Sequence, residues 1–387
     1  MGFPTEKRFI FATVLILGLC CGFSAFSGEI GKPSIETLDP NMAVADPGGE
    51  WLWYAATQLS VEGKGWMETE SFYHRLPAKA KGVVRDAVWS LGTHSAGLSV
   101  RFSTNAEKIG AKWKVVNPDL AMPHMPATGV SGLDLYVNDA GVWRWIGAGR
   151  PSGQETQAVL ASGIPEGDHE YMMYLPLYNG TESLEIGVPP NASLSRPPAR
   201  PAGSDKPVIF YGSSITQGGC ASRPGMAYTA ILGRRLGHPV INLGFSGNGT
   251  MDPEIGELLA ELDVAAYVID SVPNMKPELI AERVEPFVTA LRAARPDTPI
   301  ILVESVHFQS GAFLPAVRQG NLDRNKELRA GYEHLLEKGV AGLTYVSGES
   351  LLGNDGEAAV DGVHPTDLGF LRMADALVPV LREVLSK

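Results

Sequence analysis

The sequence predicts a β-sandwich followed by an α/β unit whose parallel sheet is covered by helices on both faces. First, all the tryptophans lie between Trp51 and Trp145, so the composition changes abruptly along the chain. Second, short alternating runs such as 133–137 and 183–188 recur before that change, separated by Gly, Pro, Asn and Asp, as in β-sandwiches. Third, from Lys206 onward short apolar runs alternate with helical stretches, which indicates a covered parallel sheet.

The N-terminus has the pattern of an export signal. A basic start at Lys7 and Arg8 precedes an apolar run that is short for a bilayer span of about 20 residues. Ala25 and Ser27 then supply small residues before a cleavage position. We therefore expect a signal peptide over residues 1–27 and a secreted or periplasmic protein. An uncleaved membrane anchor is the alternative.

Charge and cysteine content exclude several classes of partner and site. A formal net charge of −11 argues against nucleic acid and anionic membranes as partners, because both favour a basic face. Cys20 and Cys21 would leave with the signal, so Cys220 would be the only thiol of the mature chain. No intramolecular disulfide and no zinc site built on paired cysteines would then be possible. The sequence does not determine the oligomeric state.

A length of 387 residues favours two domains. Proline, alanine and serine crowd together between Pro189 and Pro207, where no periodic pattern continues. The predicted division is a signal peptide over 1–27, a β-sandwich domain over 28–190, a Pro-rich linker over 191–206 and an α/β domain over 207–387. Because proline restricts the backbone, we expect the linker to hold the two domains in one arrangement.

Within the α/β unit, apolar runs of four residues are typical of strands buried on both faces. The expected strands are 208–211, 240–243, 266–269 and 300–303, with 344–346 as a fifth. The expected helices are 227–236, 278–294, which Pro286 should kink or split, and 368–385. In such sheets the functional site lies at the carboxyl ends of the strands.

Two segments far apart in the chain carry the residues for nucleophilic catalysis. Ser214 directly follows the first predicted strand, and Asp361 and His364 lie on one loop before the last helix. Serine is a poor nucleophile until a histidine removes its proton, and that histidine needs an acceptor on its other ring nitrogen. Asp361 and His364, three residues apart, can form that pair.

Residues 211–219 resemble the first block of the SGNH/GDSL hydrolases, and Asp361-Gly362-Val363-His364 is similar to their last block, Asp-x-x-His. The resemblance implies that Ser214 is the nucleophile, His364 the general base and Asp361 the residue that orients the histidine. The intermediate blocks follow the second and third strands. They imply an oxyanion hole formed by the N–H groups of Ser214 and Gly247 and the amide of Asn274.

The resemblance has two departures. Ser213 stands where the family has aspartate, and Val272-Pro273-Asn274 replaces a compact Gly-x-Asn-Asp. In the first half, Gly132-Leu133-Asp134-Leu135-Tyr136 matches the Gly-x-Asp-Leu-Tyr signature of a β-rich domain that precedes some of these hydrolases. Together the two resemblances cover most of the mature chain.

The resemblance implies a flavodoxin-like three-layer α/β/α hydrolase preceded by a jelly-roll-like β-sandwich. It also implies an acyl-enzyme mechanism without a metal or organic cofactor. Relatives with both domains resemble bacterial esterases of O-acetylated carbohydrate, so an acetylated carbohydrate or another small ester is the expected substrate. The alternatives are a short-chain lipase or thioesterase on the same machinery and a carbohydrate-binding protein with a degenerate site.

Other residues in these segments have competing interpretations. His307 follows the fourth strand and competes with His364 as the base, although no aspartate precedes it by three residues. His124 is expected to be a surface or packed histidine, although its proline-flanked loop is a candidate wall of the site. Cys220 is expected to be a packed side chain. Asp367 is an alternative partner for His364, and Asp270 is expected to brace a loop.

Overall fold

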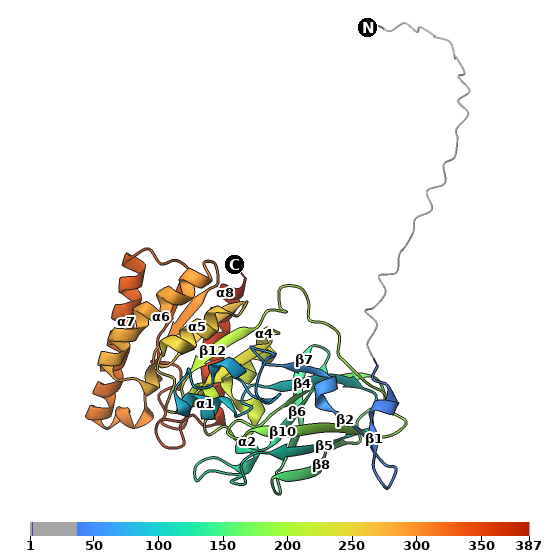
Figure 1. Ribbon diagram of the computed structural model, residues 1–387. Helices are drawn as coiled ribbons and strands as arrows, with labels where there is room; N and C mark the ends of the chain where they lie inside the picture. Colours follow the sequence, from blue (N-terminus) through green and yellow to red (C-terminus); the bar gives the residue numbers. More distant parts are fainter. Residues whose placement is uncertain (1, 3–36, 387) are drawn as a thin grey trace. The chain divides into compact units, whose positions relative to one another are not determined.

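A computed structural model of the protein contains, in its described residues, two antiparallel sheets and one parallel sheet (Figure 1). The structure describes residue 2 and residues 37–386. Apart from residue 2, the signal peptide expected over 1–27 lies outside the described residues and stays a prediction.

The two antiparallel sheets form a β-sandwich. The first sheet has the order β1 (Val44–Ala45), β2 (Leu52–Ala55), β10 (Thr181–Val188), β5 (Lys108–Val115) and β8 (Glu155–Ser162). The second has the order β11 (Leu194–Ser195), β4 (Ser99–Thr104), β9 (His169–Tyr174), β6 (Leu133–Asp139) and β7 (Val142–Gly149), and β3 (Ser60–Glu62) pairs with β4. Side chains of both sheets, including Ile109 of β5 and Phe102 of β4, share one buried core.

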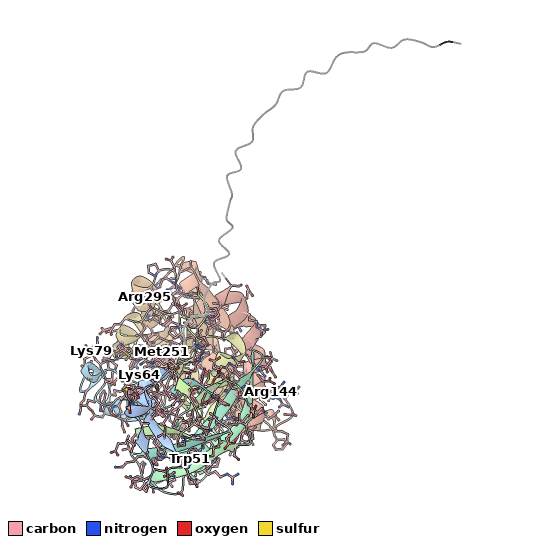
Figure 2. All side chains as sticks on the ribbon, turned by 90° about the vertical axis from the view of Figure 1, so that its right-hand side faces the viewer. Trp51, Lys64, Lys79, Arg144, Met251 and Arg295 are labelled. Atoms are coloured by element: carbon pink, nitrogen blue, oxygen red, sulfur yellow. The ribbon has the colours of Figure 1, made fainter. Side chains whose placement is uncertain are left out.

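The tryptophans have different environments, and Trp113 belongs to the core of the sandwich. Trp51, Trp53 and Trp113 are buried, whereas Trp145 is 49% exposed. Figure 2 shows Trp51 among the strands of the sandwich and the exposed Arg144 projecting from its surface. Burial is the common fate of large aromatic rings, and it leaves Trp51, Trp53 and Trp113 inaccessible to a ligand.

The parallel sheet has the order β13 (Val240–Gly244), β12 (Val208–Gly212), β14 (Ala266–Asp270), β15 (Ile300–Val303) and β16 (Leu343–Val346). The first strand in the chain therefore lies between the second and the third. The polypeptide winds in opposite directions from this switch point, where α/β folds form their sites at the carboxyl ends of strands. The α/β architecture with a preceding β-sandwich is confirmed.

Helices cover both faces of the parallel sheet (Figure 1). Phe210 and Val268 point to the face of α4 (Tyr228–Leu236) and α8 (Asp367–Leu385). Ile209 and Ile269 point to the face of α5 (Pro253–Ala260), α6 (Pro277–Ala294) and α7 (Pro315–Glu337). Shorter helices are α1 (Asp86–Gly92), α2 (Ala127–Val130), α3 (Ser214–Gln217) and the 3₁₀ turns Pro40–Met42, Ala56–Gln58, Ala78–Ala80, Pro224–Met226, Val272–Asn274 and Gln309–Ala312.

Two sequence expectations about helices need correction. Pro286 does not split α6, which runs as one helix over Pro277–Ala294. Pro286 is exposed, so water can satisfy the carbonyl that loses its helical donor. The long helix α7 was not expected, because its buried side chains are only Asn321, Asn325, Leu328 and Leu335, which is too thin an apolar stripe to recognise.

The segment expected to be a linker makes contacts with both the β-sandwich and the α/β unit. Its strand β11 pairs with β4 of the sandwich. Arg200 forms a salt bridge with Glu62 and donates to the carbonyl of Gly237. Residues 37–386 all belong to one compact unit, in keeping with a fixed arrangement. The domain boundaries at 190 and 206 stay predictions.

Arg75, from the first half of the chain, donates hydrogen bonds to the edge of the parallel sheet. β13 is an edge strand, and one nitrogen of the Arg75 guanidinium donates to its carbonyls at Asn242 (3.0 Å) and Gly244 (2.9 Å). The other nitrogens donate to Leu91 (2.7 Å) and His94 (2.9 Å). Burial lowers the pKa of Arg75 to about 9, so the side chain remains charged at neutral pH. The unpaired edge of the sheet is thus satisfied from within the chain.

We expect Arg75→Met to lower the free energy of unfolding by roughly 3–5 kcal/mol, because buried carbonyls lose their donors. Denaturant titration measures the change. The control is Arg144→Met, which removes an exposed pair with Asp139 and should cost no more than about 1 kcal/mol. Equal effects of the two substitutions would contradict a special role of Arg75.

Candidate active site

The predicted nucleophile lies at the turn between β12 and α3. Ser213 is the N-cap of α3, and its hydroxyl accepts a hydrogen bond from the N–H of Ile215 at 3.2 Å. Serine therefore caps the helix in place of the family's aspartate. Ser214 is the first residue of α3 and lies at the carboxyl edge of the parallel sheet, beside the switch point.

The structure brings Ser214, His364 and Asp361 into one hydrogen-bonded chain. Ser214 Oγ lies 2.8 Å from His364 Nε2, and His364 Nδ1 lies 2.7 Å from Asp361 Oδ2. This geometry orients the imidazole so that Nε2 can accept the serine proton. The catalytic roles of the three residues stay predictions, whereas their proximity is an observation.

The carboxylate of Asp361 is held by its own loop. Its Oδ1 accepts hydrogen bonds from the N–H groups of Val363 (3.0 Å) and His364 (2.8 Å). Partial burial would raise the pKa of Asp361. The hydrogen bonds from the His364 N–H, the imidazole and the Val363 N–H outweigh burial, and together with the charge of His364 they lower this pKa to about 2. Asp361 therefore remains ionised throughout the range in which a histidine base works.

The three predicted oxyanion-hole residues have suitable local geometry. As the first residue of α3, Ser214 has an N–H without an intrahelical acceptor. Gly247 has a φ of +69°, a left-handed conformation that glycine adopts without strain. Asn274 Oδ1 accepts from the N–H of Gly249 at 3.2 Å, which ties this side chain to the loop that carries Gly247. The assignment of these donors to an oxyanion hole stays a prediction.

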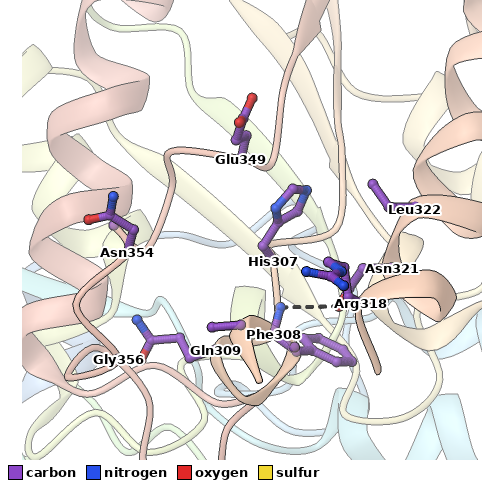
Figure 3. A pocket seen from close by; sticks show the side chains of 12 residues that line it. His307, Phe308, Gln309, Arg318, Asn321, Leu322, Glu349, Asn354 and Gly356 are labelled. Carbon is purple, nitrogen blue, oxygen red and sulfur yellow. Dashed lines mark hydrogen bonds between the residues drawn. The ribbon is translucent and has the colours of Figure 1, made fainter. Parts of the chain in front are cut away.

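His307 and Asp367, the alternatives for the base and for its carboxylate partner, make other contacts. His307 lines a cavity of about 240 Å³ together with Arg318, Asn321 and Glu349 (Figure 3), whereas the ring nitrogen near Ser214 Oγ belongs to His364. Asp367 accepts from the N–H and hydroxyl of Ser222 at 2.9 and 2.5 Å, whereas the carboxylate at His364 Nδ1 is Asp361.

Comparison with known proteins identifies the family. A model of the GDSL-like lipase/acylhydrolase family matches residues 205–382, and a GxDLY model, the N-terminus of SGNH-hydrolase-type esterases, matches residues 51–194. A crystal structure named as a GDSL-like lipase from Bacteroides ovatus ATCC 8483 has 38% sequence identity and a TM-score of 0.82, covering 87% of this chain and 98% of that one. The chain belongs to the GDSL-like lipase/acylhydrolase family.

More distant structures share the fold of this acylhydrolase. A salicylyl-acyltransferase from a tetracycline biosynthetic pathway has 19% identity and a TM-score of 0.65, covering 90% of this chain and 97% of that one. A family two carbohydrate esterase from Cellvibrio japonicus has 14% identity and a TM-score of 0.55, covering 87% and 98%. No curated protein matches the sequence. Among residues 37–386, no helix combines the length and apolarity needed to cross a membrane.

The Gly-x-Asp-Leu-Tyr motif of the acylhydrolase binds the segment that follows the nucleophile helix. The buried carboxylate of Asp134 accepts from Arg223 (2.6 Å), from the N–H of Gly225 (2.8 Å) and from Trp145 (2.7 Å). Tyr136 accepts a further hydrogen bond from Arg223 at 2.6 Å. The motif therefore fixes residues 223–225 against the sandwich, a role that its sequence alone does not reveal.

Other residues of the first half of the acylhydrolase reach the site, and sequence reasoning missed them. The Tyr178 hydroxyl donates to the carbonyl of Ser214 at 3.2 Å. Gln217 Nε2 lies 3.1 Å from His94 Nδ1, and Gln217 Oε1 accepts from the N–H of Ser246 at 3.0 Å. Burial and the charge of Arg75 lower the pKa of His94 to about 4, so His94 is neutral and accepts from Gln217.

His124 is at the surface, as expected, and it also lies next to the predicted site. Its exposed ring lies edge-on against His364 with the ring centroids 5.7 Å apart. The flanking Pro123 and Pro126 were the only available signal, and they indicate a rigid loop without indicating its neighbour. The expectation that this loop borders the site agrees with the geometry.

Cys220 and Asp270 are packed near the nucleophile. Burial and the Asp361 charge raise the pKa of Cys220 to about 12, so its thiol is protonated and unsuited to act as a second nucleophile. Asp270 accepts from Thr216 at 3.1 Å and Tyr228 at 2.8 Å beneath α3. Burial outweighs these bonds and raises the pKa of Asp270 to about 7. Asp270 thus braces the nucleophile helix.

We expect Asp361→Asn to lower kcat less than His364→Ala does, and by less than the roughly 10⁴-fold loss seen for a fully buried triad aspartate. The side chain of Asp361 is 39% exposed, so water partly replaces its charge. Because the pKa of Asp361 is about 2, the acid limb of kcat/KM against pH should follow a single proton in the wild type.

Asp355→Asn is the matched control for this substitution. The pKa of Asp355 is also about 2, but the cause is its hydrogen bonds with Arg372, away from the histidine. We expect that variant to keep the wild-type pH profile. A wild-type profile in Asp361→Asn would show instead that another group orients His364.

Proposed function

We propose that this acylhydrolase is a secreted serine esterase that hydrolyses carboxylic esters through an acyl-enzyme. The observation that supports this most directly is the chain of hydrogen bonds from Ser214 Oγ to His364 Nε2 (2.8 Å) and from His364 Nδ1 to Asp361 (2.7 Å). It lies at the carboxyl edge of a parallel sheet beside its switch point, where such folds bind their substrates.

In the first half of the reaction, Ser214 Oγ attacks the ester carbonyl carbon and its proton passes to His364 Nε2. The carbonyl electrons move to the oxygen, which the N–H groups of Ser214 and Gly247 and the Asn274 amide stabilise. Each such donor contributes about 10²–10³ in rate. The tetrahedral intermediate then expels the alcohol, which takes the proton from His364 and leaves the acyl group on Ser214.

In the second half, water attacks the acyl-enzyme while His364 removes a proton from it. Collapse of the second tetrahedral intermediate releases the carboxylic acid, and Ser214 recovers its proton from His364. Asp361, ionised because its pKa is about 2, stabilises the imidazolium in both halves. Every proton in this scheme is carried by Ser214, His364, the alcohol and water, and Asp361 takes none.

The substrate class that we propose is O-acetylated carbohydrate. The shared fold with a family two carbohydrate esterase supports this class. The side chains of His364 and Asp361 are 23% and 39% exposed, so the site opens to solvent on the histidine side. An open site of this kind suits a small acyl group carried on a bulky, hydrated alcohol. Secretion or periplasmic location rests on the signal-like sequence of residues 1–27.

Ser214→Ala and His364→Ala should each reduce ester hydrolysis to no more than a few per cent of the wild-type rate, because the members of a triad act as one unit. A fluorophosphonate should label the wild type covalently and should not label Ser214→Ala. His307→Gln is the control and should keep both activity and labelling. Labelling that persists in Ser214→Ala would place the nucleophile elsewhere, and an unlabelled wild type would favour a degenerate binding protein.

Acyl length separates the proposed acetylesterase from a lipase or thioesterase. We expect kcat/KM for p-nitrophenyl esters to fall steeply as the acyl chain lengthens beyond acetate, and acetate to be released from at least one acetylated polysaccharide of a panel. A rate that rises with chain length would overturn the acetyl assignment while leaving the serine mechanism intact.

A further inference from the structure

Three side chains with metal-binding atoms meet beside the nucleophile. His124, Cys220 and His364 each offer one ligand atom, and these atoms all lie within 4.8 Å of one another. His124 comes from the loop before α2, Cys220 follows α3, and His364 lies on the loop before α8. Two imidazoles and a thiol form a ligand set suited to thiophilic divalent cations such as Zn²⁺.

The backbone holds Cys220 in an unusual conformation. Its φ is +73°, which is uncommon for a residue with a side chain, and the residue is 5% exposed. The turn before it packs directly on the histidine, since a Cβ added at Gly219 would lie 3.3 Å from His364 Cδ2. Strained residues of this kind persist only where the surrounding structure imposes them. The turn therefore keeps the thiol beside His364.

His364 already has the surroundings of a metal ligand. A histidine that binds a metal through one nitrogen almost always donates from the other to a carboxylate or carbonyl, which fixes its orientation. His364 Nδ1 makes this bond to Asp361 at 2.7 Å, which leaves Nε2 for Ser214 or for a cation. The exposed ring of His124 lies edge-on against His364.

We propose that His124, Cys220 and His364 bind one Zn²⁺-like cation, and that the bound cation switches the esterase off. Binding itself depends only on these three side chains, whereas its effect on catalysis rests on the proposed function. The cation would be an inhibitor of the acylhydrolase and takes no part in ester hydrolysis.

The chemistry explains the inhibition. On binding, the thiol of Cys220 loses its proton to solvent, and the thiolate and two neutral imidazoles donate electron pairs to the cation. The lone pair of His364 Nε2 is then occupied and cannot accept the proton of Ser214. Zinc bonds are about 2.0–2.1 Å to nitrogen and 2.3 Å to sulfur, so the three ligand atoms must move closer together. The exposed His124 ring has the freedom to make most of that movement.

The first test measures binding without any ester. The metal-free protein is titrated with Cd²⁺, whose bond to a thiolate gives a near-ultraviolet charge-transfer band, and Zn²⁺ affinity is measured by competition with a chromophoric chelator. We expect one cation per chain and a thiolate band at saturation. A Cd²⁺ titration without a thiolate band would overturn the proposal, even if the protein hydrolysed esters normally.

Variants assign the ligands. Cys220→Ser should abolish the band, and both Cys220→Ser and His124→Gln should weaken Zn²⁺ affinity by more than about tenfold, since losing even an outer-shell partner costs 10- to 100-fold. His307→Gln removes a histidine outside the cluster and should bind as the wild type does. His124 is exposed, so its substitution tests the site even where Cys220→Ser impairs folding, which circular dichroism reports. Unchanged affinity in both ligand variants would refute the site.

The second test measures inhibition. Zn²⁺ should reduce aryl acetate hydrolysis by at least about tenfold at saturation, Mg²⁺ should not, and a chelator should restore the rate. Each variant is compared with its own metal-free rate, and His124→Gln should need more than tenfold higher Zn²⁺ for the same inhibition. Binding without inhibition would overturn the switch. A wild type that binds Cd²⁺ through Cys220 but hydrolyses no ester would refute the proposed function and leave the binding site standing.

Discussion

The arrangement of the active site depends on the cover that the N-terminal half provides for the edge of the parallel sheet. A parallel sheet ends in strands whose outer carbonyls need donors. At β13 the donor is the buried guanidinium of Arg75, which binds the carbonyls of Asn242 and Gly244. Phe245 to Gly247 follow directly, so the same contact positions the loop that carries a predicted oxyanion donor. The hydrogen bonds from Arg75 to β13 therefore contribute both to the stability of the fold and to the geometry of the site.

The β-sandwich is part of the site's support. Tyr178 donates to the carbonyl of Ser214, and Gln217 connects α3 both to His94 and to the loop at Ser246. Asp134 of the Gly-x-Asp-Leu-Tyr motif holds Arg223 and Gly225, a few residues beyond that helix. Tyr178 and His94 make these contacts from outside the α/β unit, so both halves of the chain support Ser214.

Two backbone segments also approach each other closely at the site, at Gly249 and Gly212. A Cβ added at Gly249 would lie 2.0 Å from the carbonyl oxygen of Gly212, so glycine is required where the oxyanion loop crosses the end of β12. Beneath the helix, Asp270 accepts from Thr216 and Tyr228. Ser214, the predicted nucleophile, is thus positioned by a tight turn, a buried carboxyl group and contacts from the sandwich. Preorganisation of this kind is what an oxyanion-stabilising site needs.

The sequence by itself determined the fold class, the five strands of the parallel sheet and the set of Ser214, Asp361 and His364. Strands buried on both faces require continuous apolar runs, and nucleophilic catalysis restricts residue type and spacing, so both leave a local pattern. Only the tertiary structure decided the roles of Arg75, Tyr178 and His124. Arg75 and its partner Asn242 are 167 residues apart, and no local pattern specifies such a partner. The roles of these three residues depend on their burial and on contacts with residues far away in the sequence, which exist only once the chain has folded.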